Sequence, residues 1–212
     1  MGKTLYLECY SGISGDMTVA ALLDLGADQA VLDSALKSLP VSGFQTKISR
    51  VVKGGIDACD FDVMLDKKHE NHDHDMEYLH GHHENTEADT HLHTHENGTD
   101  EMHMHSHTQE HTHAHDTESA HGHHHHEHRG LKEITHMIEH SDMTENAKKT
   151  ALRIFGILAE AEGKAHNVPA DQVHFHEVGA VDSIVDIVSA AVCLDNLEIT
   201  DVIVPVLHEG CG

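Results

Sequence analysis

The chain of 212 residues carries a formal net charge of −24 with histidine counted as neutral, and 27 of its residues are histidine. Such acidity excludes nucleic acid as a partner, because phosphates would be repelled, and it favours cations. No apolar stretch approaches a membrane span, no signal-peptide core follows the first residue, and the four cysteines form neither a CxxC pair nor a disulfide framework. We therefore expect a cytoplasmic protein that binds no membrane.

Regular elements are expected from the first residues onward. Residues 3–9 alternate like a strand, and the small-residue loop from Ser11 to Asp16 follows, with Asp16 as a good helix N-cap. Gly26 and Pro40 are typical helix ends, and Gly54-Gly55 predicts a turn between strands. The expected elements are helices over 17–25 and 29–39 and strands over 44–53 and 57–66.

A histidine- and acid-rich tract occupies residues 69–128 and holds all but six of the histidines. It contains no Lys, Arg, Ile, Val, Phe or Pro, so it cannot bury enough apolar surface to offset its ordering entropy, and we expect it to be disordered. Its His-x-His repeats let neighbouring free-base imidazoles reach one ion, with nickel, copper and zinc bound well. The candidate ligands are His72, His74, His91, His93, His95, His103, His105, His107, His111, His113, His115, His123, His124, His125 and His126.

Two plainer interpretations of the tract stay open: a solvated low-complexity linker with incidental affinity, and a purification tag. A tag is normally terminal and a plain histidine run, whereas this tract is internal and interleaved with acids. The composition therefore favours metal storage or delivery.

Alternation of strands and helices resumes after the tract. We expect helices over 131–140, 144–165 and 182–197, a strand entering a turn over 174–180, and a last strand over 201–207. This order predicts an α/β fold with a mixed sheet and packed helices. The domain would be built from residues 1–68 and 129–212, interrupted by the disordered, metal-binding insertion at 69–128.

A second concentration of candidate ligands begins at His174. On a strand, His174 and His176 share one face, and Glu177 follows at the strand end. Asp182 and Asp186 are four residues apart and share a helix face. Two imidazoles beside three carboxylates predict a site for a hard or borderline divalent ion. The alternative is a strand end with solvated polar residues.

The loop that precedes the first helix is a candidate substrate site. Backbone N–H groups between a strand and a helix can hold a phosphate, although the run is neither a Walker loop nor GxGxxG. The candidate contacts are Cys9, Ser11, Gly12, Ser14, Gly15 and Asp16. Glu8, Cys9 and Asp16 could equally contact a metal.

Two runs resemble the signatures of the LarC-type nickel insertion proteins. The run ECYSGISGDM from Glu8 to Met17 resembles their N-terminal signature, and HFHEVGAVDSIVDI from His174 to Ile187 resembles their second one. A histidine-rich insertion between the two also fits that family. The similarity extends from Lys3 to about Val206.

The resemblance implies a substrate and a reaction. Such proteins insert nickel into pyridinium-3,5-bisthiocarboxylic acid mononucleotide in a CTP-dependent cyclometallation, a lyase activity that uses a divalent ion such as manganese. The product is the nickel-pincer cofactor of lactate racemase and related enzymes, which are the downstream recipients. In the family the nucleotide-dependent work is associated with a C-terminal domain. The sequence stops at Gly212, where the family would continue, so we expect either a split-gene product that works with a C-terminal partner chain or a truncated form. The resemblance identifies no catalytic residue.

Two functions follow as alternatives. The chain is either the N-terminal part of a nickel insertase or a non-catalytic, histidine-rich nickel or zinc reservoir. The two signatures favour the insertase, because a reservoir would not need them. A metal-dependent hydrolase fits the acids but has no recognisable nucleophile arrangement.

Overall fold

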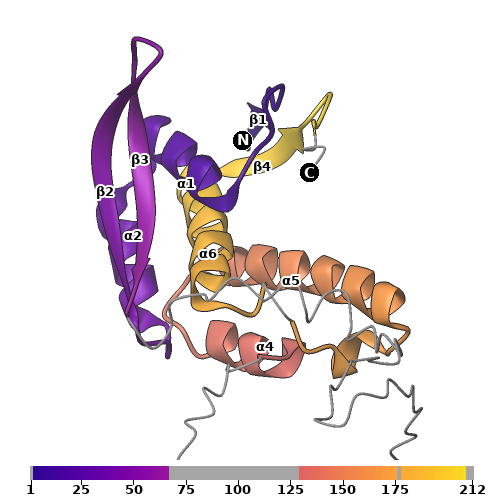
Figure 1. Cartoon of the computed structure of the whole chain (residues 1–212). Coiled ribbons are helices and arrows are strands. Elements are labelled where there is room, and N and C mark those ends of the chain that lie inside the picture. The colour runs from indigo at the N-terminus through magenta and orange to yellow at the C-terminus, as the bar shows by residue number, and fades with distance from the viewer. Residues whose placement is uncertain (1, 67–128, 176–177, 209–212) are drawn as a thin grey trace, which may run out of the picture. The chain divides into compact units, whose positions relative to one another are not determined.

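The first described segment of the computed structural model begins with a short strand and two helices. The structure describes residues 2–66, 129–175 and 178–208. The first segment contains, in order, β1 (Lys3–Tyr6), α1 (Gly15–Asp24), α2 (Gln29–Ser38), β2 (Phe44–Lys53) and β3 (Ile56–Leu65) (Figure 1). The second and third segments contain α4 (Leu131–Glu139), α5 (Glu145–His166), the 3₁₀ turn η1 (Ala170–Gln172), α6 (Val181–Asn196) and β4 (Ile199–Ile203). The expected helices are confirmed to within two residues at each end.

Local side chains explain where these helices begin and end. Gly26 follows α1 with a φ of 103°, and the N–H groups of Gly26 and Ala27 donate to the carbonyls of Leu23 and Leu22, which is the Schellman pattern. The Asp28 side chain caps α2, and the Thr144 side chain caps α5. The glycine cap agrees with the helix end expected at Gly26, and Thr144 caps the helix that was expected from position 144 onward.

The expected α/β composition is confirmed, but the strands among the described residues do not form the expected mixed sheet. The strands form two separate two-stranded sheets, β1–β4 and β2–β3. β1 and β4 are parallel, with Leu5 opposite Val202, whereas β2 and β3 form an antiparallel hairpin closed by Gly54 and Gly55 at φ values of 59° and 81°. Period-two patterning identifies strands but not their partners, and here the first strand pairs with the last.

Of the strand entering a turn that was expected over residues 174–180, the structure describes the turn at 178–180 but no strand at 174–175. His174 forms only one antiparallel bridge, to Gly130. Phe175 is fully buried, with its ring centroid 6.0 Å from that of Phe155. A Cβ on buried Gly179 would lie 3.0 Å from the Phe175 carbonyl oxygen. The buried Phe175 ring and the close approach of Gly179 to Phe175 hold this run against the core before α6 begins.

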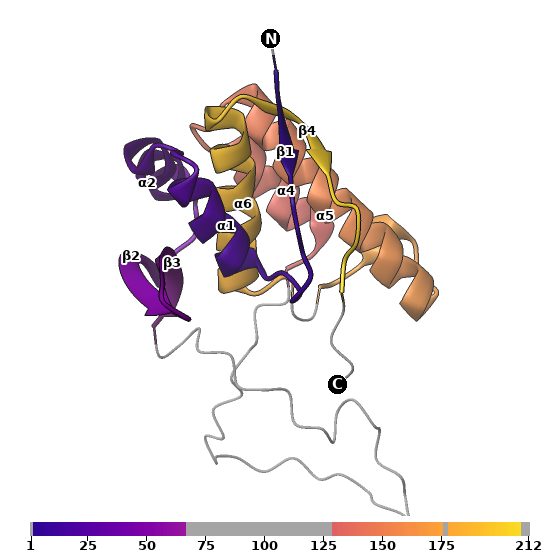
Figure 2. The same cartoon turned by 90° about the horizontal axis from the view of Figure 1, so that it is seen from above.

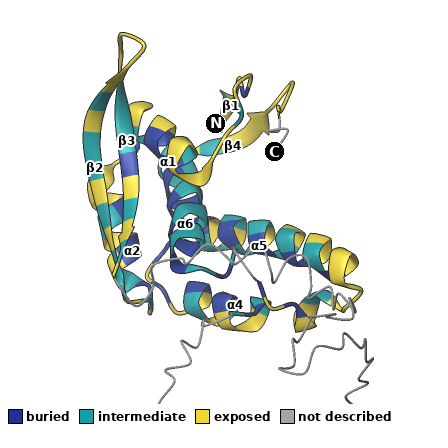
Figure 3. Cartoon of the chain, viewed as in Figure 1, coloured by how far each residue is buried: buried dark blue, intermediate teal, exposed yellow. Residues whose placement is uncertain are grey.

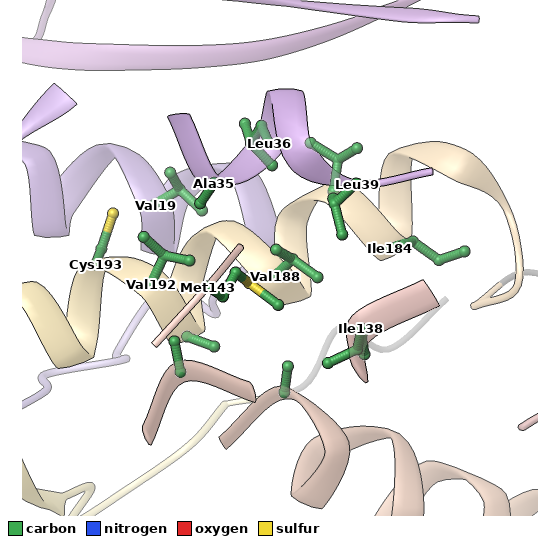
Figure 4. Close-up of a cluster of buried hydrophobic side chains, with 14 of the residues drawn as sticks. Val19, Ala35, Leu36, Leu39, Ile138, Met143, Ile184, Val188, Val192 and Cys193 are labelled. Atoms are coloured by element: carbon green, nitrogen blue, oxygen red, sulfur yellow. The ribbon is translucent and has the colours of Figure 1, made fainter. Parts of the chain in front are cut away.

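Helix α6 is the centre of the hydrophobic core. It packs against α1, α2 and α5 and also contacts β3 and β4, and α1 lies beside it in both views (Figures 1 and 2). Figure 4 shows Val188 and Val192 of α6 with Val19 of α1, Leu36 of α2 and Ile138 of α4. Residues before position 67 and after position 128 thus share one core.

The tract at 69–128 lies outside the described residues, and so do its candidate ligands. Within the described part of the chain, no helix combines the length and apolar character needed to cross a bilayer.

Candidate functional site

The loop after β1 is held against the carboxyl end of the described chain. The Cys9 carbonyl accepts hydrogen bonds from the N–H groups of Gly12 (3.2 Å) and His208 (3.4 Å). Gly12 has a φ of 83°, a left-handed conformation that glycine adopts without strain. The Cys9 side chain is buried, so the loop presents the residues after Cys9 rather than its thiol.

The loop leads into α1 two residues earlier than the sequence indicated. Asp16 was expected as the N-cap, but Ser14 is the N-cap and α1 begins at Gly15. The Ser14 hydroxyl donates to the Asp16 carboxylate, and Thr18 Oγ1 donates to the Ser14 carbonyl at 2.7 Å. Asp16 therefore lies in the first helical turn, where a negative charge interacts favourably with the helix dipole.

The start of α1 touches α6 at Gly15 and Asp186. A Cβ on Gly15 would lie 2.7 Å from Asp186 Cβ and 2.8 Å from Asp186 Cγ, with Asp186 Oδ2 closer still. Real Cβ atoms do not approach other atoms so closely, so only glycine permits this contact. The two family-like runs, far apart in the sequence, meet here.

Asp186 is electrostatically unusual. Its pKa is raised to about 6, chiefly by burial and then by the negative charges of Asp16 and Asp182, while the backbone N–H of Asp16 opposes the shift by hydrogen bonding. Its Oδ1 is buried and has no hydrogen-bond partner among the described residues. A carboxylate held close to two others, with one oxygen unsatisfied, is a feature typical of functional sites.

The chemistry of this donor set fits a hard divalent cation. Carboxylate oxygens suit Mg²⁺ and Mn²⁺, and a cation would offset the mutual repulsion of Asp16, Asp182 and Asp186. Among the described residues, however, no group of three or more histidine, cysteine or acidic residues is arranged to hold a metal ion. A cation here would therefore complete its coordination with oxygens of a substrate or of water.

His174 is not brought to the acids in the described chain. Its side chain is exposed and makes no hydrogen bond or ion pair with Asp182 or Asp186 among those that join described residues. His176 and Glu177 lie outside the described residues. The expected five-ligand site therefore stays a prediction, although Asp186, one of its two aspartates, does lie near Asp16.

The chain leaves the tract beside His174. His128, the last tract residue, directly precedes Arg129. The Arg129 carbonyl accepts the Phe175 N–H at 3.2 Å, and Arg129 Nη1 donates to the Gly179 carbonyl at 3.3 Å. Together with the Gly130–His174 bridge, these contacts join the two residues that follow the tract to the second family-like run.

Sequence reasoning missed a charged cluster between α1 and the β2–β3 hairpin. Arg50 pairs with Asp24 and with Asp57, the latter at 2.8 Å. Asp24 also accepts the Cys59 N–H at 2.8 Å, and this hydrogen bond and Arg50 lower the pKa of Asp24. Asp24 lies 26 residues before Arg50, so no spacing signal could have found that pair. Their contacts fasten α1 to the hairpin.

Comparison with known proteins places these features in context. The family model described as nickel insertion protein matches residues 5–212. Relatives that carry the name pyridinium-3,5-bisthiocarboxylic acid mononucleotide nickel insertion protein include those from Alkaliphilus metalliredigens, Geobacillus kaustophilus and Staphylococcus epidermidis. The one from Alkaliphilus metalliredigens is 46% identical over 212 residues, which is 100% of this chain and 41% of the relative. Those from Geobacillus kaustophilus and Staphylococcus epidermidis are 37% and 31% identical, over 99% and 100% of this chain and 40% and 39% of their own lengths.

The chain thus spans about two fifths of the length of these relatives. No solved structure matches it.

Proposed function

Since the chain belongs to the nickel insertion protein family, we propose that it takes part in inserting Ni²⁺ into pyridinium-3,5-bisthiocarboxylic acid mononucleotide, the compound in its relatives' names. Nickel is the cargo, and the product is the nickel-pincer cofactor used by lactate racemase-type enzymes. The polypeptide of the relatives outside these 212 residues supplies the CTP-dependent step.

The observation that carries the proposal is the pairing of Gly130 with His174. The tract is covalently continuous with Arg129, whose carbonyl accepts the Phe175 N–H. Ions that the tract holds therefore stay attached to the same polypeptide as the second run, which raises their effective concentration there. Exposed His174, with His176 and Glu177, is proposed to bind the nickel that the tract delivers.

The substrate is proposed to bind at the start of α1. N–H groups at a helix N-terminus favour the phosphate of a mononucleotide, and Ser11, Gly12, Ser14 and Gly15 precede or begin that helix. Asp16 and Asp186 would repel a phosphate, so a divalent cation such as Mn²⁺ has to lie between them. The unsatisfied Asp186 Oδ1 supports this role.

The described cysteines are free thiols, in keeping with a reducing cytoplasm.

The test is product formation by the full chain combined with the remaining polypeptide of the Alkaliphilus metalliredigens relative, supplied with CTP, Mn²⁺ and limiting nickel. The double substitution His174→Ala and His176→Ala is expected to lower the initial rate at least tenfold. The matched control is His136→Ala, which removes an exposed histidine from α4, outside both family-like runs.

An unchanged rate in the double variant would refute the transfer role of His174 and His176. If, in addition, the unmodified chain bound nickel but never raised product formation above that of the remaining polypeptide alone, the chain would be a reservoir rather than part of an insertase.

A further inference from the structure

The parallel pair β1–β4 exposes apolar side chains that sheets normally bury. Tyr6 and Ile203 are opposite each other in the register, and they are 54% and 49% exposed. Val202, the neighbour of Ile203, is 48% exposed. Successive residues of a strand point to opposite faces, so β4 is open on both faces, and Figure 3 shows it coloured as exposed over most of its length.

The exposed apolar run continues beyond β4. Val204, Val206 and Leu207 are each more than two fifths exposed. Leu207 forms a parallel bridge with Cys9, so this run follows the chain that leads from β1 to the candidate site. We call the six residues the β1–β4 surface: Tyr6, Val202, Ile203, Val204, Val206 and Leu207.

Such a pair is incomplete by the ordinary physics of sheets. Parallel strands occur almost only in sheets whose two faces are covered, and two strands are too few for a stable sheet. Leu5 and Ile199 do pack against the core, so one face is partly covered. The rest of the apolar surface stays open, and among the described strands the outer edges of β1 and β4 have no partner. An added polypeptide could pair with such an edge and cover the open faces.

We propose that the β1–β4 surface is where the rest of the nickel insertion protein docks, extending the sheet and covering its open faces. This inference rests on the proposed function for the identity of the occupant. About three fifths of each relative's length lies outside the match. That is enough polypeptide to add strands and to cover the open faces of the sheet. A second copy of this chain fits less well, because each copy carries a net charge of −24 and like charges repel.

Docking here has a consequence for the site. Through the Leu207–Cys9 bridge and the hydrogen bond from the His208 N–H to the Cys9 carbonyl, the docked polypeptide adjoins the loop that precedes Gly15 and Asp16. The CTP-dependent part would thus lie beside the proposed mononucleotide site.

The experiment mixes the full chain, without nickel or nucleotide, with the portion of the Alkaliphilus metalliredigens relative that lies outside its match to this chain. Binding is measured by calorimetry, stoichiometry by light scattering, and protection by amide hydrogen exchange. We expect a one-to-one complex with new protection over residues 3–7 and 199–204. Ile203→Asp should weaken the affinity at least tenfold, and Tyr6→Ser should also weaken the affinity.

The matched control is Val52→Asp, which places the same charge on the β2–β3 hairpin at a residue that is 72% exposed; its affinity should stay within twofold. Circular dichroism of each variant alone checks that the variant folds. If Ile203→Asp does not fold, Tyr6→Ser provides the test of the surface. The inference would be overturned if no complex formed, or if the new protection were confined to other elements. It would also be overturned if Val52→Asp weakened binding equally, or if a homodimer of this chain protected the same strands. Because nickel is absent, a failure here is distinct from a failure of nickel transfer.

Discussion

Gly15 at the start of α1 lies so close to Asp186 of α6 that a Cβ on Gly15 would come within 2.7 Å of Asp186 Cβ. This contact joins two stretches of sequence that are 171 positions apart. It also places the Asp16 carboxylate near that of Asp186, which is one cause of the raised pKa of Asp186. The contact is therefore both a packing feature and the origin of the acidic site.

Gly15→Ala is expected to push α1 away from α6 and to displace Asp186. The cost of such overpacking is about 1–3 kcal/mol, measured as the change in the free energy of urea unfolding. Binding of Mn²⁺ should weaken in parallel. The control is Gly156→Ala in α5, where a Cβ meets nothing within 4 Å and the gain in helix propensity should stabilise the chain by about 0.5–1 kcal/mol. Equal effects of the two substitutions would contradict the close contact.

Asp186→Asn should change how stability depends on pH in the metal-free chain. The pKa of Asp186 is raised from 3.8 to about 6, so the folded state takes up a proton between these values while the unfolded state does not. Stability therefore falls as pH rises through this window. The variant has no carboxylate to ionise at this buried position, so it should be more stable than the original chain above pH 6. The expected difference is only about 1 kcal/mol, because solvent screens a partly exposed group.

The measurement for Asp186→Asn is a series of unfolding curves from about pH 4 to about pH 8. The difference from the original chain should vanish toward pH 4. Asp62→Asn, which removes a charge from an exposed position on β3, controls for net charge. A difference that is constant with pH, or equal for both variants, would rule out Asp186 as the titrating group.

Asp24→Asn tests the cluster that fastens α1 to the hairpin. The pKa of Asp24 is lowered, first by the Cys59 N–H and then by Arg50. Its stabilising contribution is therefore present above its ordinary pKa of 3.8 and is lost as pH falls below that value. We expect a lower Tm for the variant at neutral pH and a smaller difference in acid. Asp57→Asn, which leaves the Cys59 contact intact, should lower the Tm less.

Phe175→Ala should be strongly destabilising, although Phe175 lies in the middle of the second family-like run. Its ring is fully buried and packs at 6.0 Å from that of Phe155. Removing a buried aromatic ring costs about 3–5 kcal/mol, whereas Phe175→Leu should cost less. Urea unfolding monitored by circular dichroism provides the comparison. If Phe175→Ala left stability unchanged but abolished product formation, Phe175 would serve the substrate and not the core.

Local signals in the sequence predicted the helices well and the strand pairing poorly. Caps such as Thr144 and the glycine at position 26 act within a few residues, so their effect can be inferred from sequence alone. Pairing of β1 with β4 depends on the whole intervening chain, and nothing in either strand identifies its partner. Alternation at His174 suggested a strand, but among the described residues His174 forms a single bridge next to the buried Phe175, which alternation does not distinguish from a strand.

The candidate site was predicted in pieces. Asp16 was assigned to a phosphate loop and Asp186 to a metal run, and only the three-dimensional contact at Gly15 shows that they belong together. A glycine that precedes an acid at a helix start could have suggested a close approach, but its partner could not be inferred from spacing. The resemblance to a family was the only signal that linked the two runs.

The most direct test of the account compares the full chain with a variant that lacks residues 69–128, both combined with the remaining polypeptide of a relative. Product formation is measured as a function of nickel concentration. Because the tract is proposed to gather nickel for residues that lie beyond Arg129, the deletion should lower the rate at limiting nickel and leave it unchanged at saturating nickel. Equal rates at limiting nickel, with each variant folded, would contradict the claim that the tract supplies the site.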